Sequence, residues 1–377
     1  MVETTGQATY TARHLDEAAQ ILARLDAGAI ERAIALLAGA RERGGRLFVL
    51  GVGGSHSLQH LVNQVTDGVA DPETKASVRE RLRAEMLVDG SSGDAKPQAR
   101  EFAKLAASGG DVPIGALGSG SDYSAFLEHL GIASLDLGFD GEDDQGGVYH
   151  SRYDSFDHYV RFGDPGFVYG VTLSKIAGHI ALRMADADVL PMRFGDFSDT
   201  YGRYVDELKR LVDSTRKDTA EQHKLLDAHA FELVSDPTRP VAAPERDSDV
   251  PAIDLAPLEQ AARALKQSAQ AFEEAYAARA ADGFRMPAEK RRAVDAAMGR
   301  MEQALTDPDG LPGRSWYEHM IYAPGMLTGY GVKTVPGVRE AIEARRWDEA
   351  GKYATITAKV LDGYRGQLDR LTAMLKE

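Results

Sequence analysis

Apolar residues in the C-terminal part of the chain, residues 198–377, recur every three or four positions, the spacing of one face of an α-helix. The two most regular stripes are Leu258, Ala262, Leu265, Ala269, Phe272 and Tyr276, and Val360, Tyr364, Leu368, Leu371 and Leu375. An apolar stripe on a helix needs a partner helix to cover it, so this part is predicted to be an all-helical bundle. The segment 235–251 holds four prolines and many charges and is expected to be a loop between helices.

Residues 56–197 show a different pattern, in which short apolar runs alternate with helical stretches. The runs 112–117 and 132–137 are strand candidates, and helices are expected near 56–70, 73–87 and 122–130. This alternation favours part of an α/β domain with a mostly parallel sheet.

The first 50 residues are rich in Ala and Leu, and their spacing predicts two helices, the second of which ends at Gly44-Gly45. Residues 46–50 predict a buried strand that runs into a glycine loop at 51–55. The expected fold class is therefore an N-terminal helical segment, a partial α/β domain and an all-helical C-terminal domain.

Composition excludes some classes of function. A net charge of -14 argues against general binding to nucleic acid or to an anionic membrane, since both would repel the chain. The sequence has no Cys, which excludes disulfides and thiolate metal sites. The start of the chain has no basic segment followed by an apolar run, and no stretch reaches 18 apolar residues, so a cytoplasmic location is expected.

Several motifs occur in a fixed order through the middle and the end of the chain. They are Leu117–Tyr123 (LGSGSDY), Phe126–Ser134 (FLEHLGIAS), Gly147–Asp154 (GVYHSRYD), Asp186–Pro191 (DADVLP), Gly310–Arg314 (GLPGR), Ile321–Pro324 (IYAP) and Val335–Gly337 (VPG). From about residue 52 to 377 the chain resembles the C-terminal half of the glutamate carboxypeptidase II, N-acetylated-alpha-linked acidic dipeptidase and transferrin receptor family of zinc peptidases.

The resemblance implies roles for individual residues. The family uses a pair of zinc ions that activates a bridging water and polarises the peptide carbonyl. His150 matches the last zinc ligand of the family, and Tyr149 matches the tyrosine that stabilises the oxyanion. Ser119, Gly120 and Ser121 match the loop that lies along a peptide-like substrate. Tyr330 matches a tyrosine of the pocket for the substrate's terminal carboxylate.

Other parts of the family site have no counterpart in this sequence. The remaining metal ligands of the family come from a His-x-Asp segment and a Glu-Glu pair. No Glu-Glu pair occurs before Gly118, and the one His-x-Asp there, His14-Leu15-Asp16, lies in the first 50 residues, which do not continue this family. One imidazole cannot hold a zinc ion, which takes three or four protein ligands. Gly329, Asp136 and Gly138 stand where the glutamate pocket has cations. We therefore expect an incomplete peptidase, weak or absent zinc binding, and no preference for acidic dipeptides.

The glycine loop resembles a second family. Residues 1–55 look like the start of a sedoheptulose 7-phosphate isomerase domain, in which Gly53, Gly54 and Ser55 would match a phosphate-binding loop. The two resemblances meet at Gly-Gly-Ser, which suggests a fusion of partial domains. The expected domains are 1–55, sugar-isomerase-like; 56–197, peptidase-like; and 198–377, a transferrin receptor-like dimerisation domain.

Three functions follow from these patterns. The first is a zinc carboxypeptidase-like or dipeptidase-like hydrolase by resemblance, catalytically incomplete and homodimeric through its C-terminal helices. The second is a non-catalytic dimeric protein of the transferrin receptor type. The third is a sugar-phosphate isomerase or binding protein that acts through the N-terminal segment. His56 and His60 lie one helical turn apart and could face a metal together, although a half-solvated helix explains them more simply.

Overall fold

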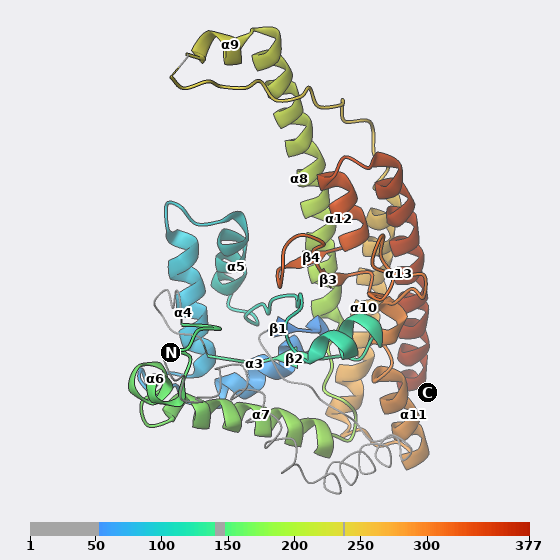
Figure 1. The fold of residues 1–377 in the computed structure, drawn as a ribbon. Coiled ribbons are helices and arrows are strands. Elements are labelled where there is room, and N and C mark those ends of the chain that lie inside the picture. Colours follow the sequence, from blue (N-terminus) through green and yellow to red (C-terminus); the bar gives the residue numbers. More distant parts are fainter. Residues whose placement is uncertain (1–52, 140–147, 237) are drawn as a thin grey trace, which may run out of the picture. The chain divides into compact units, whose positions relative to one another are not determined.

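The computed structural model describes residues 53–139, 148–236 and 238–377 (Figure 1). The chain divides into two compact units, residues 1–47 and 48–377, and every described residue belongs to the second unit. The helices and the strand predicted within residues 1–50 lie outside the described residues, as does most of the isomerase-like segment.

The C-terminal part is helical, as its apolar stripes predict (Figure 1). Its helices are α8 (Phe194–Asp227), α9 (Ala230–Val234), α10 (Ala256–Ala281), α11 (Ala288–Met298), η4 (Glu302–Leu305), α12 (Pro336–Glu343) and α13 (Trp347–Lys376). Helix α10 packs along both α8 and α13. Leu258, Leu265, Phe272 and Leu368 from the two stripes are completely buried within this one chain.

Helix α8 changes character along its length. Its first half is buried in the bundle, where the ring of Phe194 lies 4.9 Å from that of Phe272. Beyond Val212 most of its residues are exposed. A return segment, residues 235–251, runs back along this second half, and the Nε2 atom of His223 lies 2.8 Å from the carbonyl oxygen of Asp247. We call residues 213–251 the arm.

The first part of the unit consists of shorter helices. They are η1 (His56–Leu58), α3 (Gln59–Asp67), α4 (Val78–Ser91), α5 (Pro97–Ala107), η2 (Ala125–His129), α6 (Phe156–His158), η3 (Tyr159–Gly163) and α7 (Val168–Asp186). Helix α4 begins later than the sequence pattern suggests, because Ser77 and Glu80 form a capping box there. The segment η2, within the predicted helix 122–130, has the wider winding of a π-helix.

The predicted mostly parallel sheet is wrong for the described residues. They form two small antiparallel pairs, β1 (Gly53–Gly54) with β2 (Leu135–Asp136), and β3 (Tyr322–Pro324) with β4 (Val332–Thr334). The apolar run 112–117 is not a strand, because side chains of α3 bond to its backbone. Val112 donates its N–H to Oδ1 of Asn63 at 2.7 Å, and Ile114 donates to Oε1 of Gln59 at 3.1 Å.

One hydrophobic core joins the shorter helices to the bundle, with Leu61 and Leu127 in the same cluster as Leu258 and Tyr364. A polar contact crosses the same boundary, where Nδ1 of His56 lies 2.8 Å from the hydroxyl of Tyr322. Burial lowers the pKa of His56 to about 3, so this imidazole is neutral. This shared core fixes the loops around residue 119 and residue 330 with respect to each other.

Candidate functional site

Four of the residues singled out by the family motifs lie together in the structure, although they come from three separate segments. Ser119 donates its backbone N–H to the carbonyl oxygen of Tyr330 at 3.1 Å, and its hydroxyl lies 3.5 Å from the carbonyl of Gly329. The side chains of Tyr149 and Tyr330 are hydrogen-bonded to each other. A Cβ atom at Gly120 would lie 2.7 Å from the Tyr330 ring, so only glycine allows this close approach.

The two tyrosines face solvent and not the core. Tyr149 is 65% exposed and Tyr330 is 59% exposed. The hydrogen bond with Tyr330 raises the pKa of Tyr149, so at neutral pH this phenol is a proton donor. Ser121, the last residue of the predicted substrate loop, is also exposed. The result is an open surface of hydroxyl groups that can donate hydrogen bonds to a carboxylate or carbonyl oxygen.

Tyr330 belongs to the loop between β3 and β4, residues Gly325–Gly331, which we call the Tyr330 loop. Gly325 donates its N–H to the carbonyl of Gly331 at 2.9 Å, and the Thr328 hydroxyl donates to the same carbonyl at 2.6 Å. The Met326 N–H leaves the loop and donates to Oε1 of Glu340, in α12, at 2.7 Å. The Glu340 carboxylate in turn pairs with the guanidinium of Arg314.

His150 lies beside this site, and the described residues supply no metal-binding group that includes it. Its backbone has a left-handed φ of 60°, and its exposed ring lies 3.9 Å from the ring of Tyr149. In the described part of the chain, no group of three or more His, Asp or Glu side chains is arranged to hold a metal ion. Zinc, which needs three or four such ligands, does not fit the residues present here.

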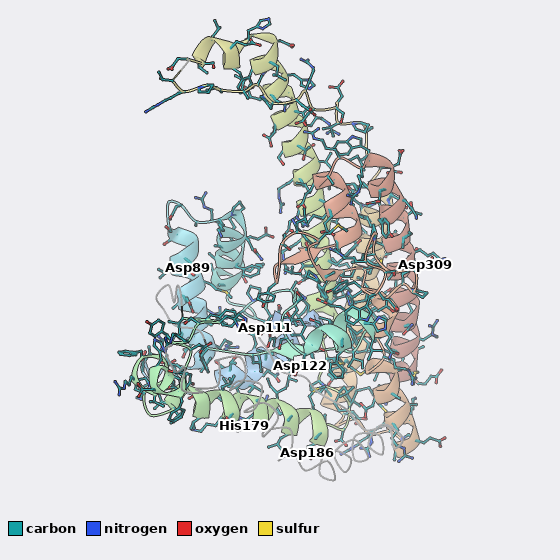
Figure 2. All side chains as sticks on the ribbon, in the orientation of Figure 1. Asp89, Asp111, Asp122, His179, Asp186 and Asp309 are labelled. Atoms are coloured by element: carbon teal, nitrogen blue, oxygen red, sulfur yellow. The ribbon has the colours of Figure 1, made fainter. Side chains whose placement is uncertain are left out.

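His56 and His60, the pair considered as metal ligands from their spacing, have different partners in the structure. The ring of His56 is buried against Tyr322. His60 has a different partner, because its Nδ1 atom lies 2.5 Å from Oδ2 of Asp111, a residue that is labelled in Figure 2. The two histidines therefore do not face a common ligand.

The glycine loop at 53–55 is occupied by contacts within the protein. Gly54 donates its N–H to the carbonyl of Gly115 at 3.0 Å, and Ser55 donates its N–H to that of Ser134 at 2.9 Å. The Ser55 hydroxyl accepts the N–H of Ser134 at 3.2 Å and is completely buried. These two amides are therefore not free to bind a phosphate, contrary to the expectation for Gly53, Gly54 and Ser55.

Two buried acids carry strongly shifted pKa values that sequence reasoning missed. Glu128 is fully buried, neither of its carboxylate oxygens has a hydrogen-bond partner, and burial raises its pKa to about 9. Asp196, at the start of α8, has one buried oxygen without a partner, and burial together with the charge of Asp111 raises its pKa to about 7. Neither acid belongs to a recognisable motif of paired acids or metal ligands in the sequence.

The amino-acid sequence is similar to known domains and proteins. Residues 253–369 match the transferrin receptor-like dimerisation domain. The chain is 31% identical to a probable glutamate carboxypeptidase of Arthroderma benhamiae, over 66% of this chain and 29% of that protein. It is 30% identical to the probable glutamate carboxypeptidase LAMP1 of Arabidopsis thaliana (60% of this chain, 27% of that protein). It is 26% identical to aminopeptidase NAALADL1 of Rattus norvegicus (70% of this chain, 32% of that protein).

These matches confirm the resemblance to the transferrin receptor-like zinc peptidase family that the motifs indicate. The chain spans less than one third of the length of each of these three relatives. Among the helices that the structure describes, none has the length and apolar character needed to cross a bilayer.

Proposed function

We propose that this chain is a peptidase-like hydrolase module that binds the C-terminal end of a peptide-like molecule at Ser119–Ser121, Tyr149 and Tyr330. The observation that supports this proposal best is the contact of Tyr330 with both Ser119 and Tyr149. Residues far apart in the sequence meet there, in the arrangement that the family motifs imply. The similarity to carboxypeptidases and an aminopeptidase favours the same class of ligand.

The chemistry of the site favours a neutral terminal residue over an acidic one. The phenol groups of Tyr149 and Tyr330 can donate to the terminal carboxylate of a peptide. A second carboxylate, on an acidic side chain, would need lysine or arginine partners. Positions 136, 138 and 329 hold Asp, Gly and Gly instead. We therefore propose a preference for peptides that end in an apolar residue.

Binding in this proposal is not accompanied by zinc-dependent hydrolysis. Cleavage of a peptide bond needs an activated water, a base and a cation for the developing oxyanion. Tyr149 could donate to an oxyanion, but the residues described supply no metal-holding group to activate the water. His150 alone is a remnant ligand, and any zinc should be weakly held.

We also propose that the chain forms a homodimer through its C-terminal helices, which the match to a transferrin receptor-like dimerisation domain supports. Most residues of the apolar stripes of α10 and α13 are already buried inside one chain, so the stripes can contribute little to the interface. The outer faces of these helices, opposite the stripes, are the proposed contact. The domains 1–55, 56–197 and 198–377 remain our proposed division of the chain.

Calorimetric titration with two dipeptides, Ala-Leu and Asp-Glu, tests the binding proposal. We expect Ala-Leu to bind more tightly, and Tyr330→Phe or Tyr149→Phe to weaken it about fivefold to tenfold, the effect of one lost hydrogen bond. Tyr153→Phe is the matched control, because Tyr153 is 68% exposed in the same segment as Tyr149. Equal affinities in the wild type and in all three variants would contradict the proposal.

A further inference from the structure

The Tyr330 loop is held in place at its flanks and not at its tip. Leu327 at the tip is 95% exposed, so packing contributes little to the position of the tip. The hydrogen bonds within the loop fix its shape but not its location on the protein. Its location depends on the Tyr330 carbonyl, which accepts the N–H of Ser119, and on the Met326 N–H, which donates to Glu340.

Glu340 is itself held from the opposite side by Arg314. Nη1 of Arg314 lies 3.3 Å from Oε1 of Glu340, and Nη2 bonds to Oε2, so the pair is bidentate. Both side chains are largely shielded from solvent, with exposed fractions of 12% for Arg314 and 16% for Glu340. The guanidinium also lies 5.8 Å from the centre of the Tyr317 ring. Such a pair has a fixed geometry, unlike a surface ion pair between mobile side chains.

We propose that Glu340, oriented by Arg314, is the positioning residue that keeps the Tyr330 loop docked on Ser119 and Gly120. Oε1 of Glu340 accepts from the loop backbone at Met326 while the carboxylate also binds the guanidinium. When this acceptor is absent, the loop loses its fixed point at one flank, and only the contacts of Gly329 and Tyr330 with Ser119 and Gly120 hold the other flank. The inference rests on the proposed function only in treating Tyr330 as a ligand-binding residue.

The chain offers a matched control on the same helix. Glu343 also lies in α12 and also pairs with a residue of the β3–β4 hairpin, because its carboxylate lies 2.7 Å from Nζ of Lys333. This pair joins the hairpin to the helix without a bond to the backbone of the Tyr330 loop. Substitution of Glu343 therefore measures the effect on amide exchange of removing an ion pair between α12 and the hairpin without removing an acceptor for the loop backbone.

Amide hydrogen exchange of the full chain, measured by NMR without ligand, tests the positioning role. We expect Glu340→Ala to speed the exchange of the Ser119 and Met326 amides at least tenfold. We expect Glu343→Ala to change them less than threefold. Glu340→Gln, which keeps an acceptor but loses the charge, should fall between the two. Amides in the middle of α10 report whether a variant is destabilised as a whole.

A double variant that exchanges the charges, Arg314→Glu with Glu340→Arg, separates positioning from stability. It can restore an ion pair, but an arginine at position 340 cannot accept the Met326 N–H, so exchange at Met326 should stay fast. Unchanged exchange at Ser119 and Met326 in folded Glu340→Ala would overturn the inference. Faster exchange with unaltered Ala-Leu binding would leave the positioning role intact and instead contradict the role of Tyr330 in binding.

Discussion

The substitution Glu128→Gln should stabilise the protein increasingly as the pH rises. Glu128 is fully buried in η2 without a hydrogen-bond partner for either oxygen. Burial raises its pKa from 4.5 to about 9, and the nearby charge of Arg314 offsets only part of that effect. The folded protein therefore keeps this carboxyl protonated at neutral pH, whereas the unfolded chain does not.

The size of the effect follows from the difference between the two pKa values. Below pH 4.5 the carboxyl is protonated in both states, so it adds no pH-dependent term to the free energy of unfolding. Between pH 4.5 and 9 the unfolded state gains about 1.4 kcal/mol per pH unit by ionising, which destabilises the fold. At pH 7 the accumulated cost is about 3 kcal/mol, and above pH 9 it is constant. Glutamine does not ionise and therefore escapes this cost.

Urea unfolding of the wild type and of Glu128→Gln, followed by circular dichroism from pH 5 to pH 9, measures the effect. The amide brings two N–H groups to a buried position, which shifts the whole curve by a constant amount, so the slope of the free-energy difference against pH is the decisive quantity. We expect the free-energy difference between the two proteins to grow by about 1.4 kcal/mol per pH unit until the pH approaches 9. Glu274→Gln, at an exposed position on α10, is the control and should run parallel to the wild type. Parallel curves for Glu128→Gln would refute the reasoning.

Three further outcomes are expected. Asp196→Asn should stabilise the protein by roughly 4 kcal/mol at pH 7 and by less than about 1 kcal/mol at pH 4. The reason is that the pKa of Asp196, raised by burial to about 7, makes the carboxyl oppose folding more as the pH rises from 4 to 7, and thermal melting at both pH values checks this. Metal analysis after dialysis should find less than one zinc per chain. An assay of amino-acid release from dipeptides should find no cleavage that a chelator abolishes. Two tightly held ions, or turnover lost in His150→Ala, would contradict that expectation. Light scattering should give a dimer at micromolar concentration, and a monomer would count against the proposed interface.

The helical part of the fold could be predicted from the sequence because its signal is local. The stripe from Leu258 to Tyr276 encodes one buried face, and Leu258, Leu265 and Phe272 are indeed inaccessible to solvent. The sheet could not be predicted in the same way. The run 112–117 is as apolar as a strand, but its backbone N–H groups donate to the side chains of Asn63 and Gln59. These partners are about 50 residues away in the sequence, so a local pattern cannot predict them.

The candidate site shows the same division. The motifs pointed to Ser119, Tyr149 and Tyr330 through family resemblance, and the structure brings them together. Sequence spacing alone could not predict this cluster, because Ser119 and Tyr330 are more than 200 residues apart in the sequence and meet only in the folded protein. Glu128 was missed because a single acid in a regular helix usually points to solvent. The π-helical turn at 125–129 is where this side chain is instead fully buried.

The arm offers a place to modify the protein without disturbing its site. Most of the described residues at its end, from Asp227 through α9 to residue 241, are exposed, and Leu233 at 79% and Val234 at 67% contribute nothing to the core. The return segment is attached to α8 through Gln222 and His223, before this end begins. Exposed segments of this kind accept inserted sequence with little loss of stability. An affinity tag or a fluorescent reporter placed after Val234 would therefore leave the bundle and the Tyr330 loop unaltered.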